Sequence, residues 1–325
     1  EAMACGLPTI GTNWSGNTAF MHTENSYLLD CEVVPVPTVG WKEISTYRGH
    51  RWAEPHLAHA IDTLRRVVEE HGEAKRKAKQ GQEEVTALYN RERVGAILKA
   101  EIARLQETHQ PHPIAPPVSK SRQKTPPVRV RFEGAQFSWH SLAHVNREIG
   151  TRLIAMPGLE VALIPTENPF FVPSEVTGGE VLASRCFVGL SAPADAHIRH
   201  FFPPRFEKPE EGKLVLIQPW EYGYLPEVWI EPIQKNVAEV WCYSKYVRDV
   251  YLNSGISEEK VKVVPLGVDT TIFHPSAPPF VFTQEPGTTL LPKGLEGRFC
   301  FLFVGGTLHR KGIDILLDAY LRAFS

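Results

Sequence analysis

The sequence predicts an α/β protein whose sheets are mainly parallel, divided into two regions by a proline-rich linker. Short apolar segments that suit β-strands alternate with amphipathic helical segments, which is the pattern of parallel sheets covered by helices. The chain of 325 residues has room for about two domains. Residues 108–127 hold six prolines, three basic side chains and no acidic one. We therefore expect an exposed, semi-rigid linker there, with a docking peptide or a basic membrane-surface contact as the alternative.

The overall composition argues against several functional classes. A formal net charge of −2 and a pI near 6.7 disfavour a polybasic nucleic-acid-binding protein. No apolar run approaches the roughly 18 residues of a transmembrane helix, and no signal peptide is recognised. Five dispersed cysteines without a Cys-x-x-Cys pair are typical of reduced thiols. These observations favour a cytoplasmic protein, with peripheral contact at the inner face of the membrane left open.

The first region begins with short elements and ends in helices. Pro55 suits a first helical turn, because its missing N–H would be unpaired there, and Gly72 suits a left-handed helix end. The short elements are a helix stub, a strand, a polar loop and a second strand, expected at 1–6, 8–12, 13–17 and 26–29. Helical spacing of apolar residues predicts three helices, at about 55–72, 73–88 and 91–106.

The second region alternates strands and helices after the linker. A turn is expected at 133–135, and a helix follows over about 142–153. Ser244 is placed as a helix N-cap, and Gly255 belongs to the C-cap of the same helix. The candidate strands are apolar runs at 128–132, 159–164, 186–189, 214–217, 237–242, 261–264 and 299–304.

The last strand, turn and helix have the composition of a phosphate-binding site. The apolar run at 299–304 leads into Gly305-Gly306, and a helix follows from about residue 312. Glycines let a phosphate approach the backbone, and a helix N-terminus offers unpaired N–H groups and a partial positive charge. Arg310 and Lys311 add full positive charges at this end. The alternative is an ordinary turn, because the spacing matches no Walker or dinucleotide-binding motif.

Two further clusters invite a functional interpretation. Trp220 and Glu221 follow the strand at 214–217, and parallel sheets bind ligands beyond the carboxyl ends of their strands. The two side chains suit a polar, ring-shaped ligand, with a structural loop as the alternative. His197 and His200 suggest a metal site, but on a strand they point to opposite faces, and no third ligand stands at a suitable spacing. No zinc or nucleophile motif occurs, so we expect no metal.

Motifs spread over the chain form a recognisable set. One is Glu-Ala-Met-Ala-Cys-Gly-Leu-Pro at 1–8, and another is the segment 240–275 with its Gly-Val-Asp at 267–269. Further motifs are Phe-Leu-Phe-Val-Gly-Gly followed by Arg-Lys-Gly-Ile-Asp within 301–314, and Phe-Glu-Gly followed by Val-Asn-Arg-Glu within 132–148. Together they resemble the retaining GT-B glycosyltransferases of family 4 (group 1). The resemblance covers nearly the whole chain outside the linker.

The resemblance implies Rossmann-like parallel sheets of GT-B type, in incomplete modules and in an unusual order. Residues 1–107 match the carboxyl-terminal part of a nucleotide-sugar-binding domain, and 128–280 match an acceptor-type domain. Residues 281–325 match an inter-domain connection and the first strand–helix unit of a second nucleotide domain. Family members place the acceptor domain first, so we expect a fragment of a tandem two-module bacterial protein, inactive as a transferase by itself. A circular permutation is the rival explanation.

The implied reaction transfers a sugar, with retention of configuration, from a nucleotide diphosphate sugar to a hydroxyl group. The donor would be a UDP-, GDP- or ADP-sugar and the acceptor a glycan or lipid-linked molecule of polysaccharide or glycolipid synthesis. Such enzymes stabilise the leaving diphosphate with positive charge, so the resemblance implies no metal and no other cofactor. The competing interpretation is a non-catalytic Rossmann-like module that binds a nucleotide or a protein partner.

The resemblance also assigns donor-side residues. Glu1 matches the second glutamate of the family's Glu-x₇-Glu motif, which binds the ribose hydroxyls. Lys311 matches the lysine that holds the diphosphate, whereas Gly306 stands where the family carries an arginine. Arg310 is the candidate substitute for that arginine, although its direction is not guaranteed by its position. The other donor-side positions are Gly16, Asn17, Thr18 and Gly305.

The acceptor side is assigned less completely. Gly134 matches the glycine of the family's acceptor loop. The histidine of the catalytic region has no clear counterpart, and His140 and Glu221 are the candidates for a catalytic role. The missing arginine at Gly306 is the feature that favours the non-catalytic interpretation.

Overall fold

The computed structural model describes residues 1–107, 126–167, 176–278 and 298–324. It divides the chain into two compact units. The first joins Glu1–Val94, Glu221–Gly223 and Leu266–Ser325, and the second joins Gly95–Trp220 and Tyr224–Pro265. Most of the expected linker lies outside the described residues, so the expectation for it stays a prediction.

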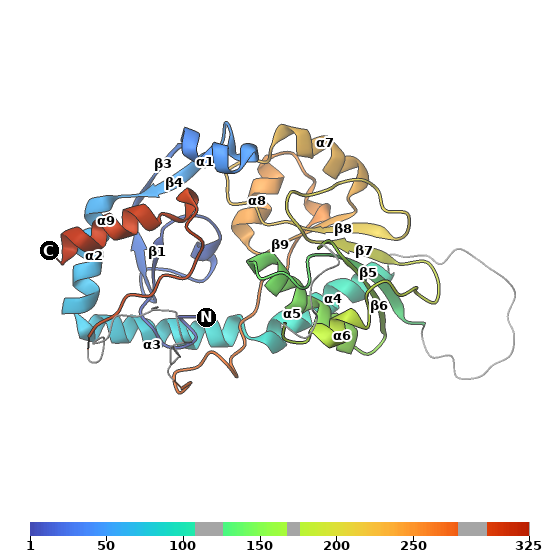
Figure 1. Ribbon diagram of the computed structural model, residues 1–325, viewed down its shortest axis with the longest axis horizontal. Coiled ribbons are helices and arrows are strands. Elements are labelled where there is room, and N and C mark those ends of the chain that lie inside the picture. Colours follow the sequence, from blue (N-terminus) through green and yellow to red (C-terminus); the bar gives the residue numbers. More distant parts are fainter. Residues whose placement is uncertain (108–125, 168–175, 279–297, 325) are drawn as a thin grey trace, which may run out of the picture. The chain divides into compact units, whose positions relative to one another are not determined.

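A six-stranded parallel sheet forms the centre of the second unit (Figure 1). Strand β6 flanks one side of β5, and β7 to β10 continue in sequence on the other side. This is the strand order of doubly wound sheets, so the predicted α/β class is confirmed and the architecture is compatible with a Rossmann-like fold. The strands are β5 (Val128–Gly134), β6 (Leu159–Pro165), β7 (Ala196–Arg199), β8 (Lys213–Ile217), β9 (Glu239–Cys242) and β10 (Val261–Val263).

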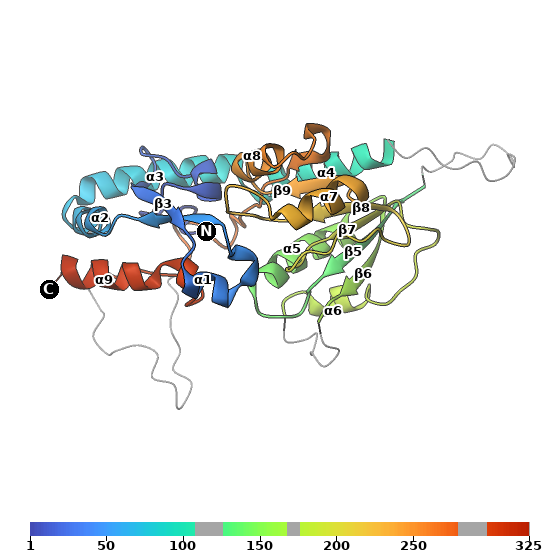
Figure 2. The same cartoon turned by 90° about the horizontal axis from the view of Figure 1, so that it is seen from above.

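Helices flank this sheet (Figure 2). The predicted caps of α8 are confirmed, since Ser244 Oγ accepts a hydrogen bond from Val247 N–H at 3.3 Å and Gly255 has a φ of +89°. The helices are α4 (Arg91–Glu107), α5 (Ser141–Ala155), α6 (Gly179–Ala183), α7 (Glu227–Asn236) and α8 (Lys245–Asn253), with a 3₁₀ turn η4 (Glu258–Lys260) before β10. The boundary between the two units falls inside α4, after Val94.

Helix α4 contributes directly to the core of the second unit. Its side chains Leu98, Ile102 and Leu105 are buried in one cluster with Phe132 of β5 and Trp241 of β9. Each such side chain contributes roughly 1.5–3 kcal/mol when fully removed from water. A helix that precedes the linker in sequence therefore stabilises a sheet that follows it.

Three local predictions for the second unit differ from the structure. Strand β5 continues through Gly134, where a turn is predicted, because Glu133 is bonded inside the sheet. The predicted strand at 186–189 is reduced to a single bridge between Leu163 and Cys186. Strand β7 is absent from the predictions, because its sequence Ala-His-Ile-Arg carries two ionisable side chains, both buried and both paired with Glu133.

The first unit contains two small sheets and several helices. Strands β1 (Ile10–Thr12) and β2 (Tyr27–Leu29) pair in parallel, and β3 (Cys31–Pro35) and β4 (Arg51–Pro55) form an antiparallel hairpin. The helices are α1 (Thr38–Glu43), α2 (Leu57–Glu69), α3 (His71–Leu88) and α9 (Ile313–Ala323), with 3₁₀ turns η1 (Ser15–Ala19), η2 (Ser45–Tyr47) and η5 (His309–Lys311). Helix α9, red in Figure 1, packs on α2 through Ala60, Leu64, Ala319 and Ala323. The two ends of the chain thus share one core.

The apolar run at 299–304 is not a strand, contrary to the prediction. Leu302 is 75% exposed and Val304 is 81% exposed, and within the described residues no strand pairs with this run. Phe301 instead packs against Tyr320 of α9, with ring centroids 6.0 Å apart. A strand needs a neighbour to accept its backbone hydrogen bonds, and the apolar pattern alone does not supply one.

Three smaller predictions for the first unit are also wrong. Pro55 ends strand β4 instead of starting a helix, a position where its missing N–H removes no needed donor. Gly72 lies inside α3, because the break between α2 and α3 falls at Glu70. Residues 1–6 form turns rather than a helix stub, although Cys5 N–H does bond to the Glu1 carbonyl at 3.1 Å.

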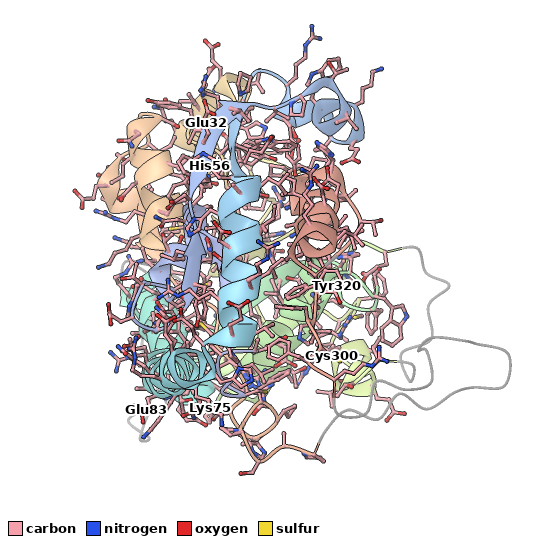
Figure 3. All side chains as sticks on the ribbon, turned by 90° about the vertical axis from the view of Figure 1, so that its left-hand side faces the viewer. Glu32, His56, Lys75, Glu83, Cys300 and Tyr320 are labelled. Atoms are coloured by element: carbon pink, nitrogen blue, oxygen red, sulfur yellow. The ribbon has the colours of Figure 1, made fainter. Side chains whose placement is uncertain are left out.

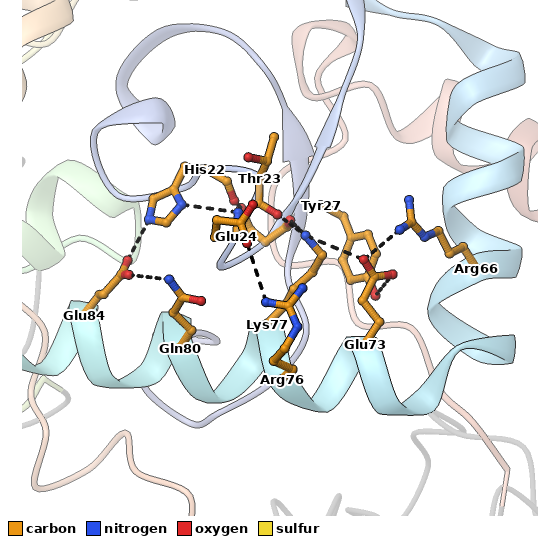
Figure 4. Close-up of polar contacts among 11 residues, drawn as sticks. His22, Thr23, Glu24, Tyr27, Arg66, Glu73, Arg76, Lys77, Gln80 and Glu84 are labelled. Atoms are coloured by element: carbon orange, nitrogen blue, oxygen red, sulfur yellow. Dashed lines mark hydrogen bonds and ion pairs between the residues drawn. The ribbon is translucent and has the colours of Figure 1, made fainter.

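Helix α3 fixes the segment that leads into β2 through polar contacts (Figure 4). Glu84 accepts hydrogen bonds from Asn25 Nδ2 at 2.7 Å and from His22 Nε2 at 2.8 Å. Lys77 is buried, donates to two carbonyls of this segment and lies 5.1 Å from the Tyr27 ring centroid. These contacts use the buried side of the helix, which explains why a strongly charged helix is stable here.

Candidate functional site

The predicted phosphate-binding residues gather at the amino-terminal end of α9. Arg310 and Lys311 lie in η5, directly before Gly312. Gly312 is the N-cap of α9 and has a φ of +64°, a left-handed conformation that favours glycine. The predicted helix start is therefore confirmed, and two cations stand next to the N–H groups of its first turn.

Arg310 contacts an acid that lies far from it in sequence. The segment Glu221–Gly223 belongs to the first unit, and Arg310 Nη1 lies 3.0 Å from Glu221 Oε1. Partial burial and the Arg310 charge lower the pKa of Lys311, whereas Glu221 opposes this shift. Tyr222 is buried beside Tyr47, with ring centroids 4.6 Å apart. Two residues chosen for separate reasons from the sequence, Glu221 and Arg310, thus form one cluster.

A second carboxylate reaches η5, the turn that directly precedes α9. Glu43, the last residue of α1, accepts a hydrogen bond from the backbone N–H of His309 at 3.2 Å. The His309 ring lies 5.6 Å from the Trp52 ring, which positions η5 against strand β4. The sequence carries no local signal for Glu43, because its role depends on the approach of α1 to η5.

The two glycines before this cluster are exposed. A Cβ placed on Gly306 would meet no atom within 4 Å, and one on Gly305 would meet only the Phe303 ring, at 3.2 Å or more. Neither glycine has a positive φ. Packing therefore does not explain Gly306, and the position has room for the arginine that the resembled family carries.

The loop after β1 uses its predicted donor-side residues for its own structure. Asn17 Nδ2 donates to the Thr12 carbonyl at 2.7 Å, and Thr18 Oγ1 donates to the Ser15 carbonyl at 2.7 Å. Ser15, next to Gly16, has a φ of +69°, which is unusual for a residue with a side chain. The loop is thereby held in a tight 3₁₀ turn with its backbone at the carboxyl end of β1.

Glu1 is exposed at the start of the first unit. Within the described part of the chain, no hydrogen bond or ion pair joins its carboxylate to the loop at 15–19 or to Arg310. Its assignment as a ribose-binding residue stays a prediction.

In the second unit, hydrogen bonds among Asn146, His200 and Tyr243 join the carboxyl ends of three strands, and we call these three residues the polar strap. Asn146 of α5 donates to the carbonyls of Ala135 and His200, at 2.8 and 3.1 Å, so its Oδ1 accepts from His200 Nδ1 at 2.5 Å. His200 Nε2 then accepts from the Tyr243 hydroxyl at 2.8 Å. Burial, assisted by the charge of His140, lowers the pKa of His200 to about 4, so the ring is neutral near pH 7.

This strap explains Gly134. A Cβ there would lie 2.4 Å from the His200 carbonyl oxygen and 2.5 Å from Asn146 Nδ2. Gly134 ends β5 and His200 follows β7, at the point where the strand order reverses and doubly wound sheets commonly bind ligands. In this chain the protein's own side chains fill that position. Sequence reasoning assigned no role to Asn146 or Tyr243, although both lie within the resembled motifs; Asn146 is inside α5 and Tyr243 directly follows β9.

A buried charge network lies beside the strap. Glu133 is 5% exposed and accepts from His197 Nε2 at 2.8 Å, from Arg199 Nε at 2.7 Å and from Arg205. Burial by itself would raise the pKa of Glu133, but the His197 and Arg199 hydrogen bonds outweigh it and lower the value to about 2. His197 and His200 therefore serve separate networks, as expected from their opposite directions on the strand.

His140, a candidate catalytic residue, is the N-cap of α5. Its Nδ1 accepts a hydrogen bond from Ala143 N–H at 3.2 Å, so the neutral ring carries its proton on Nε2. The neighbouring Trp139 is 76% exposed. The contact gives His140 a structural role, and a catalytic role stays a prediction.

The first unit also contains an acidic cavity of about 420 Å³. Glu32 and His56, labelled in Figure 3, belong to its wall. Its other polar lining residues are Glu54, Asp314 and Asp318. Because four of its nine lining residues are carboxylates and none is Lys or Arg, this cavity does not suit a phosphate, and it differs from the cluster around Arg310.

Two searches of the described residues found nothing: no group of three His, Cys, Asp or Glu side chains is arranged to hold a metal ion, and no helix is long and apolar enough to cross a membrane. The chain matched no protein-family model, no curated protein and no solved structure.

Proposed function

We propose that this chain is part of a retaining GT-B-type glycosyltransferase that uses a nucleotide diphosphate sugar. The single observation that carries the proposal is the cluster at the start of α9, where Arg310 and Lys311 adjoin a helix N-terminus and Glu221. Two cations beside a helix N-terminus suit a diphosphate, and the parallel sheet of the second unit suits an acceptor-type domain.

The chemistry follows from where charge develops. As the bond between the sugar and the diphosphate breaks, negative charge grows on the leaving phosphate oxygen. Arg310 and Lys311 would stabilise that charge by hydrogen bonds from fixed positions. A glycan or lipid-linked hydroxyl would be the acceptor, as the family resemblance implies.

A non-catalytic nucleotide-binding module is the second candidate. The open space at Gly306, where the resembled enzymes carry an arginine, favours it. Both candidates require nucleotide binding at Arg310 and Lys311, and they differ in whether the sugar is transferred.

Titration calorimetry of the full 325-residue chain with UDP, GDP and ADP tests the shared requirement. Arg310→Met and Lys311→Met are each expected to weaken binding by about tenfold or more, since a charge-assisted hydrogen bond contributes roughly 1.5–3 kcal/mol. Lys75→Met is the matched control, because Lys75 is exposed on the outer side of α3 (Figure 3). Failure of all three nucleotides to bind, or equal losses in the control, would contradict the proposal.

A further inference from the structure

The cluster at α9 is already occupied by two carboxylates of the chain itself. Glu221 pairs with Arg310 at 3.0 Å, and Glu43 accepts the His309 N–H at 3.2 and 3.4 Å through its two oxygens. A carboxylate has two acceptor oxygens and a negative charge, so it can accept the same charge-assisted hydrogen bonds as a phosphate group. Two donors suited to an anion, the Arg310 guanidinium and the His309 N–H, are therefore engaged by the chain's own acids.

The geometry points to an autoinhibitory contact: we propose that Glu43 and Glu221 act as internal placeholders, which a nucleoside diphosphate must displace to reach Arg310 and the backbone N–H of His309. This inference rests on the proposed function of the same site. It adds the regulation of that site by competition between the chain's own acids and the ligand's phosphates.

Both contacts are weak enough to be displaced. The Arg310 and Glu221 side chains are 27% and 40% exposed, so water screens their attraction. The hydrogen bonds of Glu43 lie at the long end of the accepted range. Exposed ion pairs typically contribute about 0.2–1 kcal/mol. A diphosphate that engages Arg310, Lys311 and the backbone together outweighs either one.

The placement of charge explains why a placeholder is useful. Arg310 and Lys311 are adjacent cations at a helix N-terminus, where positive charge is unfavourable for the helix. The Glu221 carboxylate acts on both, since it pairs with Arg310 and opposes the lowering of the Lys311 pKa. Without a ligand Glu221 relieves this repulsion, and with a ligand the phosphates take its place.

The competition predicts a gain of affinity when the acids are neutralised. Glu43→Gln and Glu221→Gln keep the size of the side chain and remove its charge. Each is expected to tighten binding of inorganic pyrophosphate and of UDP by about 1.5-fold to fivefold at low salt, and the double variant by about twofold to 25-fold. The gain is expected to shrink as ionic strength rises.

The experiment is titration calorimetry of the full chain with pyrophosphate and with UDP. Asp318→Asn is the matched control, because Asp318 lies on α9 but pairs with Arg322 at 2.8 Å. In an Arg310→Met background, Glu221→Gln is expected to bring no gain, which ties the effect to the pair. Thermal unfolding of each variant verifies that it is folded.

The outcomes separate the inference from the function on which it rests. Binding by the unaltered chain with no gain in the double variant overturns the placeholder role and leaves the proposed function standing. An equal gain in Asp318→Asn, or a gain from Glu221→Gln that survives without Arg310, also overturns it. Absence of binding in the unaltered chain and in every variant overturns both.

Discussion

Replacing Gly134 by alanine tests whether this glycine serves the fold or a ligand. The new Cβ would lie 2.4 Å from the His200 carbonyl oxygen and 2.5 Å from Asn146 Nδ2, so backbone or strap must shift. Overpacking of a buried site costs about 1–3 kcal/mol, and weakening the Asn146 hydrogen bonds adds about 1 kcal/mol. We expect Gly134→Ala to lower the free energy of unfolding by about 2–4 kcal/mol.

Equilibrium unfolding in urea, followed by tryptophan fluorescence, measures this loss. With a slope of about 2 kcal/mol per molar urea, the midpoint is expected to fall by about 1–2 M. Gly95→Ala is the matched control, because Gly95 lies in α4 with open space around it and no positive φ. Alanine there is expected to stabilise the helix by about 0.5–1 kcal/mol. An unchanged midpoint in Gly134→Ala would refute the steric argument and return Gly134 to the role of a ligand contact.

Three further predictions concern buried groups of the second unit. Gln136 is fully buried and, among the residues that the structure describes, neither polar atom of its amide has a hydrogen-bond partner. Gln136→Met is therefore expected to raise the free energy of unfolding by about 1–3 kcal/mol, and a loss of stability in urea unfolding would contradict this. The pKa of Glu133 is lowered from 4.5 to about 2, so its ionised form stabilises the fold above pH 4.5 and that stabilisation is lost as pH falls toward 2. Unfolding measured from pH 6 to pH 2.5 should therefore lose less stability in Glu133→Gln than in the unaltered chain, and identical pH slopes would be the contrary result. Ile102→Ala in α4 is expected to cost about 2–5 kcal/mol in the same urea assay, since Ile102 is 3% exposed in the core of the sheet, whereas a neutral effect would show that α4 is dispensable.

The fold of the second unit was predictable where the local pattern was complete. Strands β6, β8 and β9 are short apolar runs that end at polar loops, and the structure has all three. Strand β7 escaped prediction because its His197 and Arg199 are buried only by pairing with Glu133, which lies more than sixty residues earlier. Pairing across that distance leaves no trace in the local sequence.

The run at 299–304 shows the opposite failure. Its apolar and aromatic residues have a high strand propensity, yet Leu302 and Val304 remain exposed. Propensity describes what a residue does once a neighbouring strand exists. Strand propensity can be read from the local sequence, but whether a second strand lies beside this run depends on how the whole unit folds.

The candidate site was predictable in its parts and not in its pairing. Rules about strand ends and helix N-termini select Glu221 and Arg310 separately. Their contact, and that of Glu43 with His309, depends on how distant segments of the first unit pack. A charged side chain that a local sequence pattern assigns to ligand binding can therefore pair with another part of the chain instead.

The residues of the resembled motifs fall into two groups, those that packing constrains and those that it does not. A Cβ on Gly267 would lie 3.3 Å from Val94, and Asp269 accepts from Thr271 N–H at 2.9 Å and pairs with Arg91. Gly134 is likewise constrained by packing, so these parts of the resemblance are explained by architecture. Among the described residues, no atom lies within 4 Å of a Cβ placed on Gly306, so a side chain can start there without a close contact. Substituting Gly306→Arg is thus the change that adds a cation at this end of α9 without disturbing the fold, and for a diphosphate site it should increase affinity.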